Sequence, residues 1–138
     1  MFGSFPNRAA AYAQVGVETG VSTADPHQLI LMLFDGALLS VGTASAAMEN
    51  QDIRGKGQAI SKAIEIIMNG LKASLDLNAG GELAARLATL YDYMSERLLY
   101  ANLHNSRPAL DEVHGLLETL REAWAGIAPG TTAANVAA

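Results

Sequence analysis

The sequence predicts an all-α protein, an antiparallel up-down four-helix bundle with a flexible N-terminal segment and a disordered C-terminal tail. Apolar residues recur at spacings of three and four along four successive stretches, which is the pattern of helices that bury one face. Short runs of turn residues separate these stretches, so sequential helices are expected to pack side by side and antiparallel. No alternating run of apolar and polar residues indicates a strand.

The first two predicted helices run from Pro26 to about Glu49 and from about Ile53 to Leu77. Asp25 can cap the first turn, and Pro26 stands where its missing N–H costs nothing. The first helix is expected to bury Ile30, Leu33, Phe34, Ala37, Val41, Ala44 and Met48. The second is expected to bury Ile60, Ile64, Ile67, Leu71 and Leu75.

The third predicted helix runs from Glu82 to about Asn105, and the fourth from Pro108 to about Ala128. Gly80 and Gly81 separate the second helix from the third, since glycine tolerates the left-handed conformation that ends a helix. The third helix is expected to bury Leu83, Leu87, Leu90, Tyr91, Met94, Leu98 and Ala101. The fourth has the most regular stripe, which predicts a buried face made of Leu110, Val113, Leu117, Leu120, Trp124 and Ile127. Leu120 and Trp124 are expected to be largely buried.

The chain divides into a flexible N-terminal lid segment at 1–24, the bundle at 25–128 and a disordered tail at 129–138. Its 138 residues suit one domain, with 50% hydrophobic and only 17% charged residues. The net charge of −5 and the scattered basic residues argue against nucleic acid as a partner. There is no cysteine, and no stretch looks long enough for a membrane span, so a cytoplasmic protein without membrane insertion is expected.

Catalysis is not expected, and neither a cofactor nor a metal is predicted. Asp111 and His114 have a ligand-like spacing, but both fall outside the apolar stripe of their helix, which favours a solvated pair over a metal site. The segment Arg54-Gly55-Lys56-Gly57 resembles a phosphate-binding loop in composition only, because no strand precedes it and no Lys-Ser/Thr pair ends it.

Apolar residues that fall off the buried stripes predict a surface for a partner. Met32 and Leu39 lie seven apart and nearly opposite the buried stripe of the first helix, and Tyr93 and Tyr100 repeat this spacing on the third. On the second helix, a second apolar row of Ile66, Ala73 and Leu77 lies beside a low-relief seam of the small residues Ala63 and Gly70. Scattered exposed apolar residues are the ordinary alternative, but their recurrence on three helices favours binding. The candidate partner-binding residues are Tyr12, Leu31, Met32, Leu38, Leu39, Ile66, Ala73, Leu77, Tyr93 and Tyr100.

Motifs spread over about residues 11–128 resemble the FliS family of flagellin export chaperones, in order and with similar spacing. These motifs include Ala11-Tyr12-Ala13-Gln14-Val15, Asp25-Pro26-His27-Gln28-Leu29-Ile30, Met32-Leu33-Phe34-Asp35-Gly36-Ala37, Lys56-Gly57, Ile60-Ser61-Lys62-Ala63, Asn69-Gly70-Leu71-Lys72, Gly80-Gly81-Glu82, Leu90-Tyr91-Asp92-Tyr93-Met94, Arg97-Leu98-Leu99, Ala101-Asn102 and Glu122-Ala123-Trp124.

The resemblance implies a cytoplasmic chaperone that binds the disordered C-terminal region of flagellin and prevents its premature polymerisation. It further implies delivery of flagellin to a component of the flagellar type III export gate. In this family the N-terminal segment can cover the apolar surface of the bundle when no client is bound, which would give that role to Tyr12. A generic helical adaptor or regulator that binds another amphipathic helix is the alternative, and a monomer and a homodimer both stay open.

Overall fold

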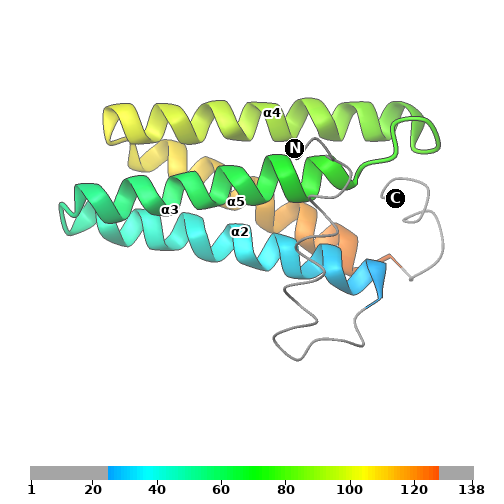
Figure 1. Ribbon diagram of the computed structural model, residues 1–138, viewed down its shortest axis with the longest axis horizontal. Coiled ribbons are helices and arrows are strands. Elements are labelled where there is room, and N and C mark those ends of the chain that lie inside the picture. The colour runs from blue at the N-terminus through cyan, green and yellow to red at the C-terminus, as the bar shows by residue number, and fades with distance from the viewer. Residues whose placement is uncertain (1–24, 128–138) are drawn as a thin grey trace, which may run out of the picture.

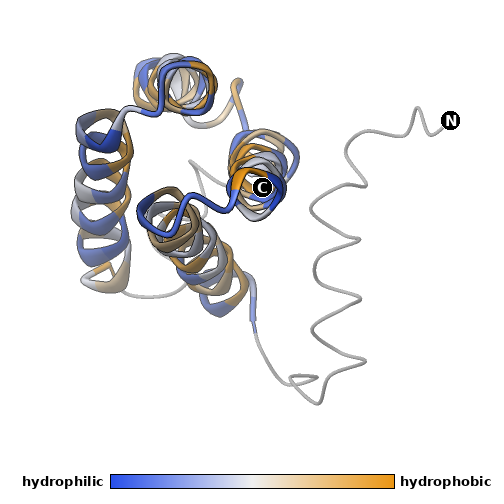
Figure 2. Cartoon of the chain, turned by 90° about the vertical axis from the view of Figure 1, so that its left-hand side faces the viewer, coloured by the Kyte–Doolittle hydropathy of each residue, from blue (hydrophilic) through white to orange (hydrophobic). Residues whose placement is uncertain are grey.

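Four helices form an antiparallel bundle in the computed structural model, which describes residues 25–127 (Figure 1). They are α2 (Pro26–Glu49), α3 (Ile53–Glu65), α4 (Gly81–His104) and α5 (Arg107–Ala125), with a π-helical and a 3₁₀ turn after α3. Each helix packs on its neighbour in sequence, and α5 also packs on α2, which closes the ring. Figure 2 looks along the bundle and shows the helices around one interior. The predicted all-α bundle is confirmed.

Side chains cap three of the helices at their first turns. The carboxylate of Asp25 accepts a hydrogen bond from the Gln28 amide at 2.8 Å, and that of Asp52 accepts one from the Gly55 amide at 3.0 Å. The hydroxyl of Ser106 accepts one from the Ala109 amide at 3.2 Å. Each cap satisfies a backbone donor that the helix itself leaves unpaired, so the short connections define where the helices begin.

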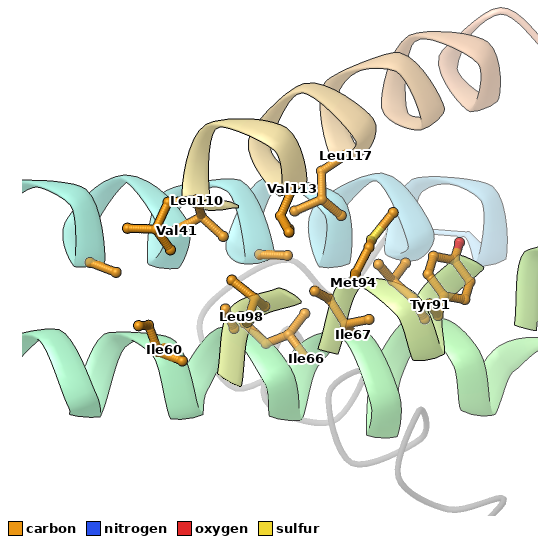
Figure 3. Close-up of a cluster of buried hydrophobic side chains, with 14 of the residues drawn as sticks. Val41, Ile60, Ile66, Ile67, Tyr91, Met94, Leu98, Leu110, Val113 and Leu117 are labelled. Atoms are coloured by element: carbon orange, nitrogen blue, oxygen red, sulfur yellow. The ribbon is translucent and has the colours of Figure 1, made fainter. Parts of the chain in front are cut away.

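The core is formed by the inner stripes of all four helices, which meet along the bundle axis (Figure 3). The predicted stripe of α2 is buried from Ile30 to Ala44, and Met48 packs against the core at its edge. The largest side chains that are completely buried are Ile60, Ile67, Leu71, Met94, Leu98, Leu110 and Leu117, with Val41 and Val113 between them.

The second helix ends earlier than its apolar pattern predicts. Regular α-helix stops at Glu65, a π-helical turn covers Ile66–Leu71, and a 3₁₀ turn covers Lys72–Ser74. Leu75 is extended, and the Asp76 carboxylate then accepts hydrogen bonds from the amides of residues 78 and 79. This local turn satisfies backbone donors outside a helix, so the expected extension to Leu77 was wrong.

A buried lysine joins α3 to the C-terminus of α4 at one end of the bundle. Lys56 is only 5% exposed, and its ammonium donates hydrogen bonds to the Asn102 carbonyl at 3.0 Å and to the Asn105 side chain at 2.5 Å. The Asn102 carbonyl lies in the last turn of α4, where helical carbonyls lack partners and the helix dipole favours a cation. The lysine therefore closes this end of the bundle.

A polar junction joins α4 to α5 near the start of α5. The Glu112 carboxylate accepts a hydrogen bond from the Tyr93 hydroxyl at 2.5 Å and another from the Arg97 guanidinium at 2.8 Å. The hydrogen bond from Tyr93, followed by that from Arg97, lowers the pKa of Glu112, and the same carboxylate raises the pKa of Tyr93. From this junction α5 runs obliquely, so that its C-terminal end lies beside the start of α2 and away from α4 (Figure 1).

By length and composition, α2 could cross a membrane, and it is the single helix in the 25–127 range that meets this test. The expectation that no stretch approaches the length of a span was therefore too strict. Core helices of soluble proteins pass the same test, and the inner stripe of α2 packs against the other three helices.

Neighbouring leucines on α4 provide a test of the core. Leu98 is fully buried, whereas Leu99 is 58% exposed. We expect Leu98→Ala to lower the free energy of unfolding by about 2–5 kcal/mol, because it removes buried methyl groups and leaves a cavity. Leu99→Ala, measured by the same urea titration, should change it by less than about 0.5 kcal/mol. Equal losses would show that the phase of α4 is wrong.

The α4–α5 junction predicts a pH-dependent contribution to stability. Since the pKa of Glu112 is lower in the folded protein, its carboxylate stabilises the fold above the pKa of the unfolded chain. That contribution is lost as the pH falls through the folded-state pKa. Glu112→Gln should therefore destabilise the protein near neutral pH, and its difference from wild type should shrink in acid, as measured by urea unfolding at both pH values. Glu96→Gln, on the exposed side of α4, is the control.

Candidate functional site: an end pocket and the outer face of the first helix

An apolar pocket of about 160 Å³ opens at the end of the bundle where α2 starts and α5 ends. We call it the end pocket. Its wall is formed by residues of α2, α4 and α5 and of the turns that follow α3, and Tyr91 contributes a phenol whose pKa is raised by burial. Its lining is made of Ile30, Phe34, Leu71, Leu75, Leu83, Leu87, Tyr91, Leu120, Ala123, Trp124 and Ile127.

Several residues of this pocket were predicted to be core and are not fully covered. Leu83 is 51% exposed, so its predicted burial was wrong, whereas Leu120 and Trp124 are partly buried and pack against the core, as predicted. The stripes are apolar as predicted, but α5 runs away from α4 at this end and α3 has already ended at Glu65. The first turn of α4 is therefore only partly covered on this side, with Leu83 exposed and Leu87 packed against the core.

His27 and Trp124 form a reciprocal contact beside the end pocket. The His27 Nε2 atom donates a hydrogen bond to the Trp124 carbonyl at 2.8 Å, and the Trp124 indole donates one to the His27 carbonyl at 3.0 Å. The two rings are stacked, with centroids 5.2 Å apart and planes 15° from parallel. We call this contact the His27–Trp124 clasp. It fastens the last turn of α5 to the first turn of α2.

The side of α2 that faces away from the core is almost free of charge. Leu39 is 72% exposed and Met32 is half-buried, as the helical phase of the sequence predicts. The only charged residue between them, Asp35, is paired with the Arg121 guanidinium at 2.5 Å. We call this surface the α2 outer face, made of Met32, Asp35, Leu39, Gly42 and Ala46. Leu31 and Leu38 are half-buried beside it, and Leu38 packs against the core.

The candidate row on the second helix is divided by the structure. Ile66 is buried, because its side chain packs over Gly36 of α2, where an added Cβ would lie 3.4 Å from the Ile66 methyl group. The low-relief seam of Ala63 and Gly70 is buried too, so the helices that approach it belong to this chain. Ile66 was therefore wrongly placed on an outer row. Ala73 is half-buried and Leu77 is exposed, as a partner surface requires.

Tyr93 and Tyr100 lie together on the exposed side of α4, as predicted, but they are not free of contacts. The Tyr93 hydroxyl donates a hydrogen bond to Glu112, and the Arg97 guanidinium lies 4.8 Å from the centre of the Tyr100 ring. The His104 ring also contacts Tyr100, with the ring centroids 4.4 Å apart. These side chains form an ordered polar and aromatic patch that is separate from the end pocket.

Two further predictions concern single positions. Tyr12 lies outside the described residues. Asp111 is paired with Arg107 at 3.5 Å and His114 with Glu118 at 3.6 Å, as expected for residues on a solvated face. Within residues 25–127, no cluster of three or more His, Cys, Asp and Glu side chains is placed to hold a metal ion.

Sequence reasoning did not find His27 or the end pocket as functional features. Most of the lining residues were on predicted inner stripes, so only their incomplete cover distinguishes them. His27 contacts a residue 97 positions away, and nothing in its local spacing indicates that partner. The one available signal was that these residues gather at the same end of an antiparallel bundle.

Comparison with known proteins gives the same family over nearly the whole chain. Residues 8–131 match the family model described as Flagellar protein FliS. The chain is 56% identical over 119 residues to the flagellar secretion chaperone FliS of Salmonella typhimurium, covering 86% of this chain and 88% of that protein. It is 48% identical to the Escherichia coli chaperone, with 83% and 84% covered, and 38% identical to that of Bacillus subtilis, with 86% and 84% covered. The chain belongs to the FliS family of flagellar secretion chaperones.

Proposed function

We propose that this protein binds the disordered C-terminal region of flagellin in the cytoplasm, prevents its premature polymerisation and delivers it to the flagellar export apparatus. The observation that carries the proposal is the end pocket, an apolar opening whose lining residues come from α2, α4, α5 and the turns that follow α3. Monomeric soluble proteins seldom leave such a surface uncovered unless it binds something. No catalytic step is part of this function.

The surfaces described suit a client that becomes helical when bound. An amphipathic helix can place its apolar side chains in a groove at spacings of three, four and seven residues. The end pocket can take a large side chain, while the α2 outer face offers a strip along which the client can continue and whose one charged residue, Asp35, is paired with Arg121. Ordering a disordered segment costs several kcal/mol, so contact over both surfaces is needed to offset it.

The direct test is a calorimetric titration with the isolated C-terminal segment of the host flagellin. We expect saturable one-to-one binding with a negative heat-capacity change, because apolar surface is buried. An unrelated amphipathic helix of equal length and charge is the control. Equal affinity for both peptides would favour the generic adaptor, and an absence of binding to flagellin would contradict the proposed client.

The α2 outer face can be tested separately from the fold. Changing Met32 and Leu39 together to Glu should weaken flagellin binding by about tenfold or more, roughly 1.4 kcal/mol or above. The helical circular dichroism should be preserved, since both residues point away from the core. Leu99 and Leu103 on α4 are also exposed, so the same double change there is the matched control. A folded Met32/Leu39 variant with unchanged affinity would exclude this face.

We further propose that residues 1–24 act as a lid segment that competes with the client through Tyr12. The described chain begins at Asp25, beside the end pocket, and a tyrosine side chain can bury about 150–250 Å² in an apolar site. An occupied pocket lowers the apparent affinity for a second ligand in proportion to the closed fraction. The segment can dock on its own bundle or on a second copy, giving a monomer or a homodimer.

Removal of the lid segment should therefore expose the pocket. Deleting residues 1–24, or changing Tyr12 to Ser, should tighten or preserve binding of the flagellin segment and promote self-association, measured by calorimetry and by sedimentation. Hydrogen exchange in residues 8–18 should become faster when flagellin binds. Unchanged exchange, affinity and association state together would rule out the lid.

A further inference from the structure

We propose that His27 is a positioning residue that holds the end pocket open by fixing Trp124 through the His27–Trp124 clasp. The inference rests on the proposed function, because it concerns the site that we assign to the flagellin segment. His27 does not line the pocket, whereas Trp124 does. The histidine therefore acts on the pocket through its partner.

The clasp constrains Trp124 in three ways at once. One hydrogen bond holds its backbone carbonyl, a second holds its indole nitrogen, and the stacked imidazole fixes the plane of the ring. A carbonyl can only accept, so the Nε2 atom of His27 carries the hydrogen of the first bond. Both bonds are partly buried, where the loss of one partner leaves a polar atom without its hydrogen bond. Neither ring can turn without breaking these contacts.

The end of α5 has few other attachments that could do this. Its junction with α4 is at Glu112, more than three helical turns before Trp124. The ion pair between Arg121 and Asp35 ties α5 to α2 one turn earlier, but both side chains are partly exposed to solvent, where ion pairs contribute little. The Trp124 carbonyl also accepts the Ile127 amide at 3.1 Å, so the clasp supports the turn that carries Ile127, a further wall residue.

Without the clasp, the last turn of α5 is free to move across the opening toward the exposed Leu83 of α4 and fill it.

The only tryptophan of the chain makes this proposal measurable, because all tryptophan fluorescence reports on the pocket wall. In the full chain, His27→Ala should shift the emission of Trp124 to the red, increase its quenching by acrylamide and speed hydrogen exchange in residues 123–127. Its affinity for the flagellin segment should fall roughly tenfold. His27→Gln, which keeps a side-chain N–H donor of similar reach, should restore part of each effect.

His104→Ala is the matched control, because His104 also contacts an aromatic ring but lies at the opposite end of the bundle. It should leave the tryptophan signals and the affinity as in wild type. Trp124→Phe keeps an aromatic wall without the indole donor, so it tests the second bond by affinity and exchange if His27→Ala fails to fold.

The outcomes separate this proposal from the proposed function. If the wild-type protein binds no flagellin segment, the proposed function fails, while fluorescence, quenching and exchange still decide whether His27 fixes Trp124. If folded His27→Ala matches wild type in all three signals, the clasp is not a positioning device. If the signals change and flagellin affinity does not, the clasp exists but does not serve the client site, and the proposal is overturned.

Discussion

The oblique course of α5 is the constraint on which the two ends of this bundle depend. Close to its start, α5 is held to α4 through Glu112, and at its end it is held to α2 through the His27–Trp124 clasp. Since α5 is also tied to α2 at its start, by the Arg107–Glu49 pair, it follows α2 along its length and leaves α4 toward its end. The interior is therefore closed where α5 begins and open where it ends, and the apolar stripes of α4 and α5 remain partly uncovered there.

This arrangement reconciles a stable fold with an apolar binding surface. The central layers are enclosed and carry the stability of the bundle; they are made of Leu110, Val113 and Leu117 on α5 and of Met94 and Leu98 on α4. The residues that follow on the same stripes line the end pocket. They are less buried and therefore contribute less to the free energy of unfolding. A client can thus occupy positions that follow directly from the core, and it meets side chains already held by the helices that form the core.

Periodicity predicted the parts of the structure that depend on local signals. The bounds of α2 were found because Asp25 and Pro26 start the helix and polar residues end it, and the buried faces of all four helices had the correct phase. Periodicity shows which face is apolar, but not whether a neighbour covers it, so Leu83 was assigned to the core although it is exposed. The burial of Ile66 could not be seen for the same reason, since it depends on Gly36 in another helix.

The π-helical turn and the His27–Trp124 clasp could not be predicted from nearby residues in the sequence. The π-helical turn at Ile66–Leu71 has more residues per turn than an α-helix. Its position is set by packing against α2 and α4 rather than by a helix-breaking residue at Glu65. The clasp joins residues near opposite ends of the chain through backbone as well as side-chain atoms. Neither could be inferred before the helices had been placed beside one another.

The buried position of Lys56 gives the closed end a chemical property that the other lysines lack. Its amine is enclosed and donates to two acceptors, whereas Lys62 on the same helix is exposed to solvent. Acylating reagents need access to a free amine, so Lys62 should be modified while the bundle is intact and Lys56 only when α3 and α4 separate. The ratio of modification at Lys56 to that at Lys62 therefore reports whether α3 and α4 stay packed at the closed end while the end pocket binds or releases a ligand.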